Sequence, residues 1–140
     1  MAIYESIFLR LDFFEDKGFI EATWYPTTEN FTEREYKEEF LNYLHLALEF
    51  KPKRAMINTQ DFLFTTSPTL QEWTSETISA PIIEMGLKQM AFVVSKEFIA
   101  QLAIEQLMEE PSAQKFTTKY FDSKEEAKEW ILSFADSETM

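Results

Sequence analysis

Hydrophobic and polar positions along this chain change their period several times, and each change predicts a different secondary-structure element. The opening segment, Ile3 to Phe14, is apolar on both alternating sets of positions, and the segment from Gly18 to Tyr25 has the same character. Lys17 and Gly18 stand between them as a turn pair, because glycine readily adopts the positive φ angles that tight hairpin turns require. We therefore predict a β-hairpin of strands 3–14 and 18–25.

A helical period follows the hairpin. Apolar residues recur at i, i+4, i+7 and i+8 through the segment 32–50, which is the spacing of one helix face. Thr32 and Glu35 form a capping box at its start, with Phe31 and Tyr36 in the positions of a hydrophobic staple. Pro52 closes the segment. The pattern predicts a helix over 32–50.

A second helix is predicted after the short apolar strand RAMINT, residues 54–59. Thr69 and Glu72 have the spacing of a capping box, and Pro68 precedes them. Pro81 lies within the helical pattern, so we expect a kink or a restart there, since proline removes a backbone donor and clashes with the preceding turn. Gly86 is placed to cap the end of this helix.

The last third of the chain repeats the alternation of strand and helix. QMAFVVS (89–95) and KFTTKYF (115–121) are predicted strands. Ser95 is expected to cap a helix that Pro111 stops, and Ser123 with Glu126 forms a third capping box. The final helix carries an apolar face at i, i+3, i+4 and i+7, which consists of Ala127, Trp130, Ile131 and Phe134.

The predicted order is therefore ββαβαβαβα in one domain, residues 1–140. Strands that alternate with helices imply right-handed crossovers, so we expect an α/β fold with a mixed, mostly parallel sheet of about five strands and four helices. The length of 140 residues is that of a single domain, and 45% apolar residues provide material for one core.

Charge narrows the range of functions. Thirteen basic against 25 acidic residues give a net charge of −12, which repels phosphate backbones and anionic lipid surfaces. We expect no nucleic-acid partner and no membrane insertion. The helical acids Glu33, Glu35, Glu38 and Glu39 are interpreted as a solvated face. The absence of cysteine, of a signal sequence and of a long apolar run fits a cytoplasmic protein.

Three stretches of sequence resemble the STAS superfamily, whose prototypes are anti-sigma factor antagonists, and within it the small stand-alone STAS-like proteins. They are RAMINTQD with the hydroxyl-bearing helix start after it, IIEMGLKQMAFVVS, and KYFDSKEEAKEWI. The resemblance covers nearly the whole chain and implies a STAS-like fold with a regulatory or binding role. In regulatory members the strand leads into an Asp-x-Ser motif whose serine is phosphorylated; here residues 62–66 separate Asp61 from Ser67, so a phosphoserine is not carried across.

Motifs for catalysis and cofactor binding are not assembled by this sequence. The lone histidine, His45, lies on the predicted first helix and is interpreted as a structural or surface residue. A G-x-S-x-G elbow and the glycine-rich phosphate loops are missing, and no cofactor is expected. Asp61 and Asp122, each after a predicted strand, are the pair to test for a hard cation, although turn and capping roles are favoured.

The loop AMINTQDFLFTTSPTLQEW is the predicted site. In open α/β sheets ligands gather outside the carboxyl ends of the strands, where this loop, Ser95 and Asp122 are expected to converge. Its apolar residues Phe62, Leu63 and Phe64 can either pack inward or line a pocket. The candidate ligand- or partner-binding residues are Gln60, Asp61, Phe62, Phe64, Ser67, Thr69, Ser95 and Asp122, with Ser67 and Thr69 as candidate phosphorylation sites.

Three functions stay open at this point. The favoured one is a non-catalytic STAS-like domain that binds a protein partner or a small, partly apolar ligand at residues 60–70. An enzyme that uses Asp61 and the nearby hydroxyls is the alternative, and a structural homodimer is the third. A deep pocket around a carboxylate would favour the enzyme, whereas a shallow apolar site would favour binding.

Overall fold

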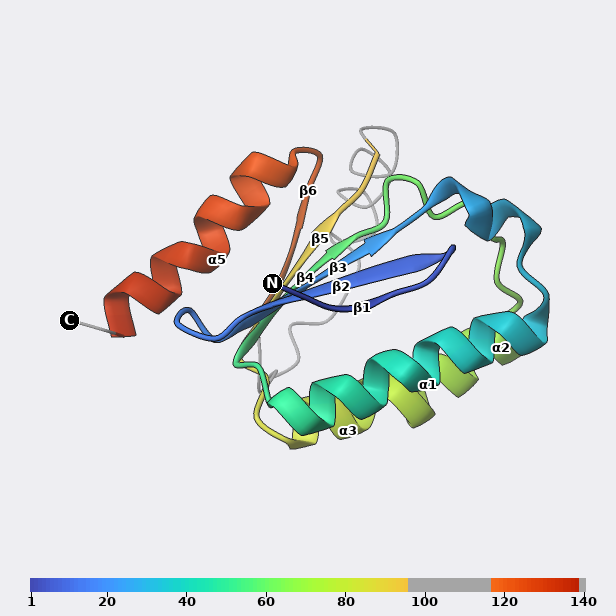
Figure 1. The fold of residues 1–140 in the computed structure, drawn as a ribbon, viewed down its shortest axis with the longest axis horizontal. Coiled ribbons are helices and arrows are strands. Elements are labelled where there is room, and N and C mark those ends of the chain that lie inside the picture. Colours follow the sequence, from blue (N-terminus) through green and yellow to red (C-terminus); the bar gives the residue numbers. More distant parts are fainter. Residues whose placement is uncertain (96–116, 139–140) are drawn as a thin grey trace, which may run out of the picture.

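The fold is mixed α/β and is built on a six-stranded sheet (Figure 1). The computed structural model describes residues 1–95 and 117–138. Each strand pairs with its neighbours in the chain, so the order is β1-β2-β3-β4-β5-β6. β2 (Leu9–Phe14) pairs antiparallel with β1 (Ala2–Glu5) on one side and with β3 (Phe19–Trp24) on the other. β3, β4 (Arg54–Asn58), β5 (Gln89–Val93) and β6 (Thr117–Phe121) run parallel.

The prediction of one continuous strand over 3–14 is wrong, and for this reason the sheet has six strands rather than about five. A turn at Ser6 divides the segment into β1 and β2. The Ser6 hydroxyl accepts hydrogen bonds from the amides of Phe8 at 3.1 Å and Leu9 at 3.2 Å, and the Ser6 amide donates to the Leu9 carbonyl at 2.8 Å. Alternating apolar residues continue through this turn, so the pattern does not reveal it.

The second hairpin turn forms where the sequence predicts it. Gly18 has φ of +65°, and the flanking residues Phe14 and Phe19 are paired across β2 and β3. The Gly18 carbonyl also accepts from the amides of Lys53 at 2.8 Å and Arg54 at 3.2 Å. The turn therefore positions the start of β4 as well as closing the hairpin.

Helix α1 (Glu33–Phe50) confirms the first capping box. The Glu35 amide donates to the Thr32 hydroxyl at 3.1 Å, and the Thr32 amide donates to the Glu35 carboxylate at 3.0 Å. A short 3₁₀ turn, η1 (Pro26–Asn30), precedes it. The rings of the predicted staple, Phe31 and Tyr36, lie 6.1 Å apart. This end of α1 is thus fixed by local chemistry.

The second helix is a continuous rod made of α2 (Pro68–Thr74), the π-helical turn η2 (Ser75–Ser79) and α3 (Ala80–Glu84). The prediction that Thr69 caps it is wrong. Ser67 is the N-cap, and its hydroxyl accepts from the Leu70 amide at 3.2 Å. Pro68 occupies the first helical position, where its missing N–H costs nothing.

Pro81 neither stops nor restarts this rod. The Ala80 amide bonds to the Ser75 carbonyl, five residues back, so the helix has widened into a π turn immediately before the proline. A locally wider turn relieves the crowding between the proline ring and the preceding turn. Gly86 ends the rod with φ of +112°, which confirms its predicted role.

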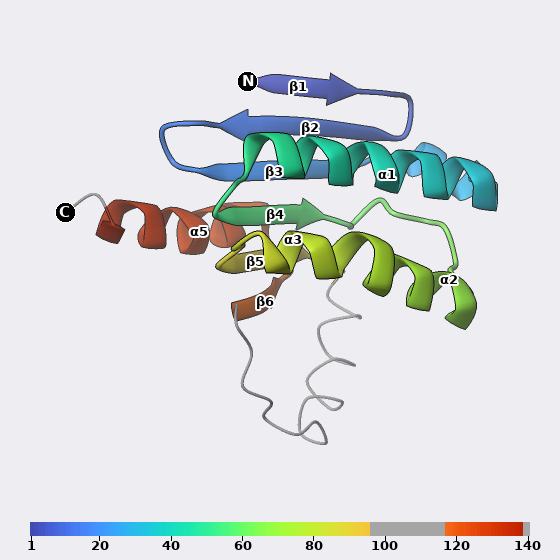
Figure 2. The ribbon, with the colours of Figure 1, turned by 90° about the horizontal axis from the view of Figure 1, so that it is seen from below.

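Helices cover both faces of the sheet (Figure 2). α1 and the rod lie on one face, and α5 (Lys124–Glu138) lies on the other. The larger core cluster fills the first interface and the smaller one the second; Ala127 and Ile131 of α5 are fully buried in the smaller cluster. The amide of Glu126 donates to the Ser123 hydroxyl at 3.3 Å. The predicted helix that begins at Ser95 and ends before Pro111 lies outside the described residues.

Glu39 departs from the expected solvated face of α1. It is only 8% exposed, and its carboxylate accepts from the Tyr4 hydroxyl at 2.8 Å and the Ser6 hydroxyl at 3.0 Å. Asn42 donates to the same tyrosine oxygen at 3.1 Å. These bonds join the edge strand β1 to α1, which the helical charge pattern alone does not indicate.

Candidate functional site

A surface depression lies where the parallel strands end. Its volume is about 620 Å³, and we call it the outer depression. The loop after β4, the end of β5 and strand β6 each contribute to its wall. The residues that line it are Thr59, Gln60, Phe62, Leu63, Phe92, Val94, Ser95 and Tyr120. This is the edge of an open α/β sheet at which ligands usually bind.

Hydrogen bonds tie the loop after β4 to the neighbouring strand ends. The amide and the hydroxyl of Thr59 both donate to the Val93 carbonyl, at 2.9 and 3.0 Å. The Gln60 side chain donates from Nε2 to the Asp122 carbonyl at 3.1 Å. Three consecutive strand ends are therefore held together at one side of the outer depression.

The middle of the loop is anchored from below by Thr28, which is fully buried. The Thr28 hydroxyl accepts from the Leu63 amide at 2.9 Å and shares its proton between the carbonyls of Tyr25 at 2.9 Å and Asp61 at 3.2 Å. With the backbone fixed on both sides, Phe62 turns inward and Leu63 turns outward. Leu63 is 50% exposed.

Phe62 and Phe64 pack into an aromatic cluster beneath the loop. The Phe62 ring lies 5.2 Å from that of Trp24, and the Phe64 ring lies 5.5 Å from that of Tyr36. Both phenylalanines are half-buried against the larger core. Of the two roles that the sequence left open, Phe64 takes the packing role, whereas Phe62 packs and also lines the outer depression.

The predicted site residues separate into two groups. Gln60, Phe62 and Ser95 line the outer depression, and Asp122 joins them through the bond from Gln60. Asp61 is exposed and lies in the turn after β4.

The other predicted residues lie along the loop toward α2. Phe64 lies in the aromatic cluster, Ser67 caps α2, and Thr69 is exposed in its first turn. Figure 1 shows this loop leaving the end of β4 and descending to the start of α2. The start of the loop, which carries Gln60, therefore lies at the strand ends, whereas its end, which carries Ser67 and Thr69, does not.

A second, more apolar cavity of about 160 Å³ lies inside the larger core, between the sheet, α1 and the rod. We call it the inner cavity. Trp24 and Ile57 line it from the sheet, Phe40 from α1, and Ile78 and Ile82 from the rod. Phe92 lines both the inner cavity and the outer depression.

Tyr43 of α1 also lines the inner cavity. The residue is 7% exposed, and its hydroxyl is buried with no hydrogen-bond partner among the described residues. Burial raises the pKa of Tyr43 far above its ordinary value. By contrast, the nearby Tyr36 hydroxyl is hydrogen-bonded to that of Thr74 at 2.7 Å, although burial raises its pKa as well.

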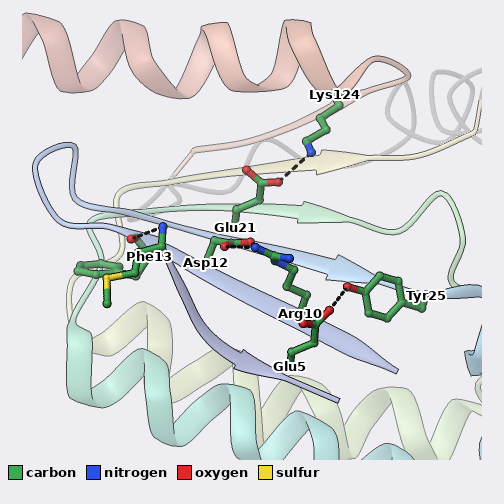
Figure 3. A network of polar contacts seen from close by, with 8 residues as sticks. Glu5, Arg10, Asp12, Phe13, Glu21, Tyr25 and Lys124 are labelled. Carbon is green, nitrogen blue, oxygen red and sulfur yellow. Dashed lines mark hydrogen bonds and ion pairs between the residues drawn. The ribbon is translucent and has the colours of Figure 1, made fainter. Parts of the chain in front are cut away.

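Titratable side chains gather away from both cavities, on strands β1, β2 and β3, at the face of the sheet on which α5 lies (Figure 3). Arg10 binds Asp12 through two hydrogen bonds of 3.0 and 3.2 Å. The ammonium of Lys124 of α5 lies 3.1 Å from the carboxylate of the buried Glu21. On β1, the Glu5 carboxylate accepts a hydrogen bond from the Tyr25 hydroxyl. Each acid of this network has a partner, and none lines either cavity.

The remaining groups that were weighed for catalysis stay apart. His45 is exposed on α1. Within residues 1–95 and 117–138, no three histidine or acidic side chains are grouped so as to hold a metal ion.

Several lining residues were not predicted from the sequence. Phe92 and Tyr120 are cross-strand partners with stacked rings 5.2 Å apart, and strand alternation combined with the strand order would have placed them on one face. The sequence does not indicate that Tyr43 lines a cavity, because a tyrosine within the apolar face of a helix is normally a core residue.

Comparisons with protein-family models, with curated proteins and with solved structures find no match for this chain. In the part of the chain that the structure describes, no helix has the length and apolar character needed to cross a bilayer.

Proposed function

We propose that this chain is a non-catalytic, STAS-like binding or regulatory domain whose site is the outer depression and the loop 60–70. One observation carries the proposal: among the residues that the structure describes, the lining of the outer depression combines apolar side chains with the polar groups of Thr59, Gln60 and Ser95, and includes no acid, histidine, lysine or arginine. Such a wall can orient a ligand, and Tyr120 is the one titratable side chain among its described residues.

A small, partly apolar ligand suits this site better than a protein partner does. A stable protein interface buries about 800 Å² on each side, with large apolar side chains at its centre. The exposed large apolar residues of the described chain are Met1, Ile7, Leu48, Phe50 and Leu63. Leu63 is the one among them that lines the outer depression. The exposed apolar surface at this site is therefore small and concave.

The enzyme alternative depends on Asp61. The structure supports it less well, because Asp61 is exposed in a turn and does not line either cavity. A homodimer has no specific observation in its favour.

Regulation by phosphorylation of Ser67 or Thr69 is a second part of the proposal. Both residues are exposed, so a kinase could reach them. A phosphate on the N-cap residue would lie close to the positive end of the rod's dipole, and it would add negative charge to a chain of net charge −12. Ser67→Asp tests this part: we expect the variant to remain folded and to change binding at the outer depression.

The binding proposal can be tested with the neutral fluorophore N-phenyl-1-naphthylamine, whose emission rises in apolar sites. We expect saturable binding by the wild-type protein and a loss of at least tenfold in affinity for Leu63→Asp. Leu48→Asp is the matched control, because Leu48 is also exposed, at 38%, and lies on α1 away from both cavities.

Native mass spectrometry then distinguishes the occupants. A small-molecule adduct that Leu63→Asp removes supports the ligand, whereas a co-purifying protein that the same variant releases supports the partner. If Leu63→Asp and Leu48→Asp bind the fluorophore equally well, the outer depression is not the site. Asp61→Asn should leave binding unchanged; abolished binding in that variant would favour the enzyme alternative.

A further inference from the structure

We propose that the inner cavity is a separate binding site for a neutral molecule the size of one six-membered ring that carries a single hydroxyl or carbonyl group. This inference does not rest on the proposed function, because it concerns another cavity with other walls. It follows from three observations on the described residues: the volume of the cavity, the unpartnered hydroxyl of Tyr43 and a lining without charged side chains.

The volume sets the size of the ligand. The inner cavity measures about 160 Å³, and apolar protein cavities of roughly 150 Å³ admit a benzene ring. Its walls are those of an aromatic or alicyclic site, with Trp24 and Phe40 stacked 4.9 Å apart on one side and Ile78 and Ile82 on the other. A longer or bicyclic molecule exceeds this volume and would have to extend out of the cavity or displace the side chains that line it.

Tyr43 sets the polar group of the ligand. A buried hydroxyl without a partner is disfavoured, because folding removes its bonds to water and replaces them with nothing. The hydroxyls of Tyr36 and Thr74 are satisfied by contrast: Thr74 binds both Tyr36 and the Leu70 carbonyl, at 2.7 and 2.8 Å. Tyr43 belongs to the lining, but its hydroxyl is closed to a water-sized molecule. A ligand hydroxyl or carbonyl therefore supplies the bond that Tyr43 lacks only when the Tyr43 side chain or its neighbours shift on binding.

The lining also requires a neutral ligand. Among the described residues, no lysine, arginine, histidine, aspartate or glutamate lines the inner cavity, so a carboxylate or an amine would be buried against this lining without a counter-ion. The free energy lost by removing an unpaired charge from water exceeds what one hydroxyl can return. Phenol is therefore a suitable probe, and benzoate is its charged counterpart of similar size.

The π turn of the rod contributes to this cavity. η2 carries Ile78 and Ser79, which both line the wall, and the bond from the Ala80 amide to the Ser75 carbonyl shows the wider turn. Single π turns within helices are disfavoured in general and recur at functional sites. Here the π turn contributes two side chains of different chemistry, Ile78 and Ser79, to the same lining as Tyr43.

The experiment is a titration of the full-length protein with phenol, benzene and benzoate, followed by NMR of isoleucine methyl groups. We expect phenol and benzene to give saturable shifts and intermolecular NOEs at Ile78 and Ile82, and benzoate to give none. Tyr43→Phe keeps the ring and removes the hydroxyl, so it should weaken phenol binding by roughly 3- to 10-fold and leave benzene binding unchanged.

Two controls keep the outcomes distinct. Ser79→Phe, which enters the cavity from its half-buried wall, should abolish binding of both neutral probes while the methyl spectrum remains that of a folded protein. Leu63→Asp alters the outer depression and should leave phenol binding unchanged, so failure of one site does not imply failure of the other. Absence of probe contacts at Ile78 and Ile82 in the wild type overturns the proposal, as does an equal loss of phenol and benzene binding in Tyr43→Phe.

Discussion

Replacing Ser67 with alanine, beside the same replacement at Thr69, tests where the second helix begins. The structure gives the two neighbouring hydroxyls different roles. The Ser67 hydroxyl accepts from the Leu70 amide at 3.2 Å as the N-cap, whereas Thr69 follows Pro68 in the first turn and is exposed. Two similar substitutions, two residues apart, should therefore differ in their effect on stability.

The magnitude follows from the lost hydrogen bond. Removing a serine N-cap costs about 0.5–2 kcal/mol, typically near 1. Thr69→Ala removes no capping bond and replaces a β-branched residue with the best helix former, so it should change stability by a few tenths of a kcal/mol at most, in either direction. A loss of 1 kcal/mol corresponds to a fall in Tm of roughly 3–5 °C for a domain of this size.

Urea unfolding followed by far-UV circular dichroism measures both variants, with Tm as a second readout. Ser67→Asp is the control, because its carboxylate retains an acceptor at the N-cap and favours the helix dipole; it should be at least as stable as the wild type. If Thr69→Ala costs as much as Ser67→Ala or more, the helix begins at Thr69 and the structural assignment is wrong.

Three further predictions concern other parts of the fold. Tyr4→Phe removes the bond to the buried Glu39 and the bond from Asn42, so urea unfolding should show a loss of roughly 1–2 kcal/mol, whereas an unchanged midpoint would mean that this network does not hold β1. Burial raises the pKa of Tyr43 above 10.0, so the native state retains a proton that the unfolded chain loses, and stability should fall as the pH rises above 10. In Tyr43→Phe this fall should be smaller by about 1 kcal/mol between pH 10 and 11, and the difference in slope should approach about 1.4 kcal/mol per pH unit at higher pH; equal slopes from pH 10 to 11 would contradict it. Gly86→Ala meets no atom within 4 Å but must adopt φ of +112°, so scanning calorimetry should show a loss of about 1–2 kcal/mol that comes from the backbone alone.

The elements that the sequence predicted correctly are those whose signals are local. The capping box of Thr32 and Glu35 uses two side chains within one turn, and its geometry does not depend on the rest of the fold. Gly18 acts in the same way, since a positive φ is a property of one residue. Strand alternation and helical period then suffice to give a mixed α/β sheet, because buried faces must be continuous.

The errors occur where two local signals compete or where a distant residue decides. Thr69 with Glu72 and Ser67 with Pro68 are both acceptable helix starts by sequence, and the helix takes the earlier one because the proline fits the first helical position. Glu39 has the sequence environment of a solvated acid, but strand β1 brings Tyr4 and Ser6 over it. No pattern within α1 contains that information.

The candidate site shows the same division. Topology alone directs attention to the carboxyl ends of the strands, and Gln60, Phe62 and Ser95 do line one depression there. The hydroxyl cluster was expected at the same place because it follows closely in sequence, yet the loop that the Thr28 hydroxyl holds leads it away to the start of α2. Residues that are close along a loop need not be close in space, because hydrogen bonds to a few of them, here Asp61 and Leu63, set the direction in which the chain continues.

The inner cavity depends on features that are even less local. Tyr43 occupies a helix position at which phenylalanine would preserve the packing without burying a hydroxyl, and the π turn opposite uses a helix geometry that is disfavoured in general. Each feature alone costs stability, and neither is needed to build a sheet covered by helices. That both line the same cavity is what a binding site in this part of the core would require, since a site of this kind retains groups that become satisfied only when a ligand is bound.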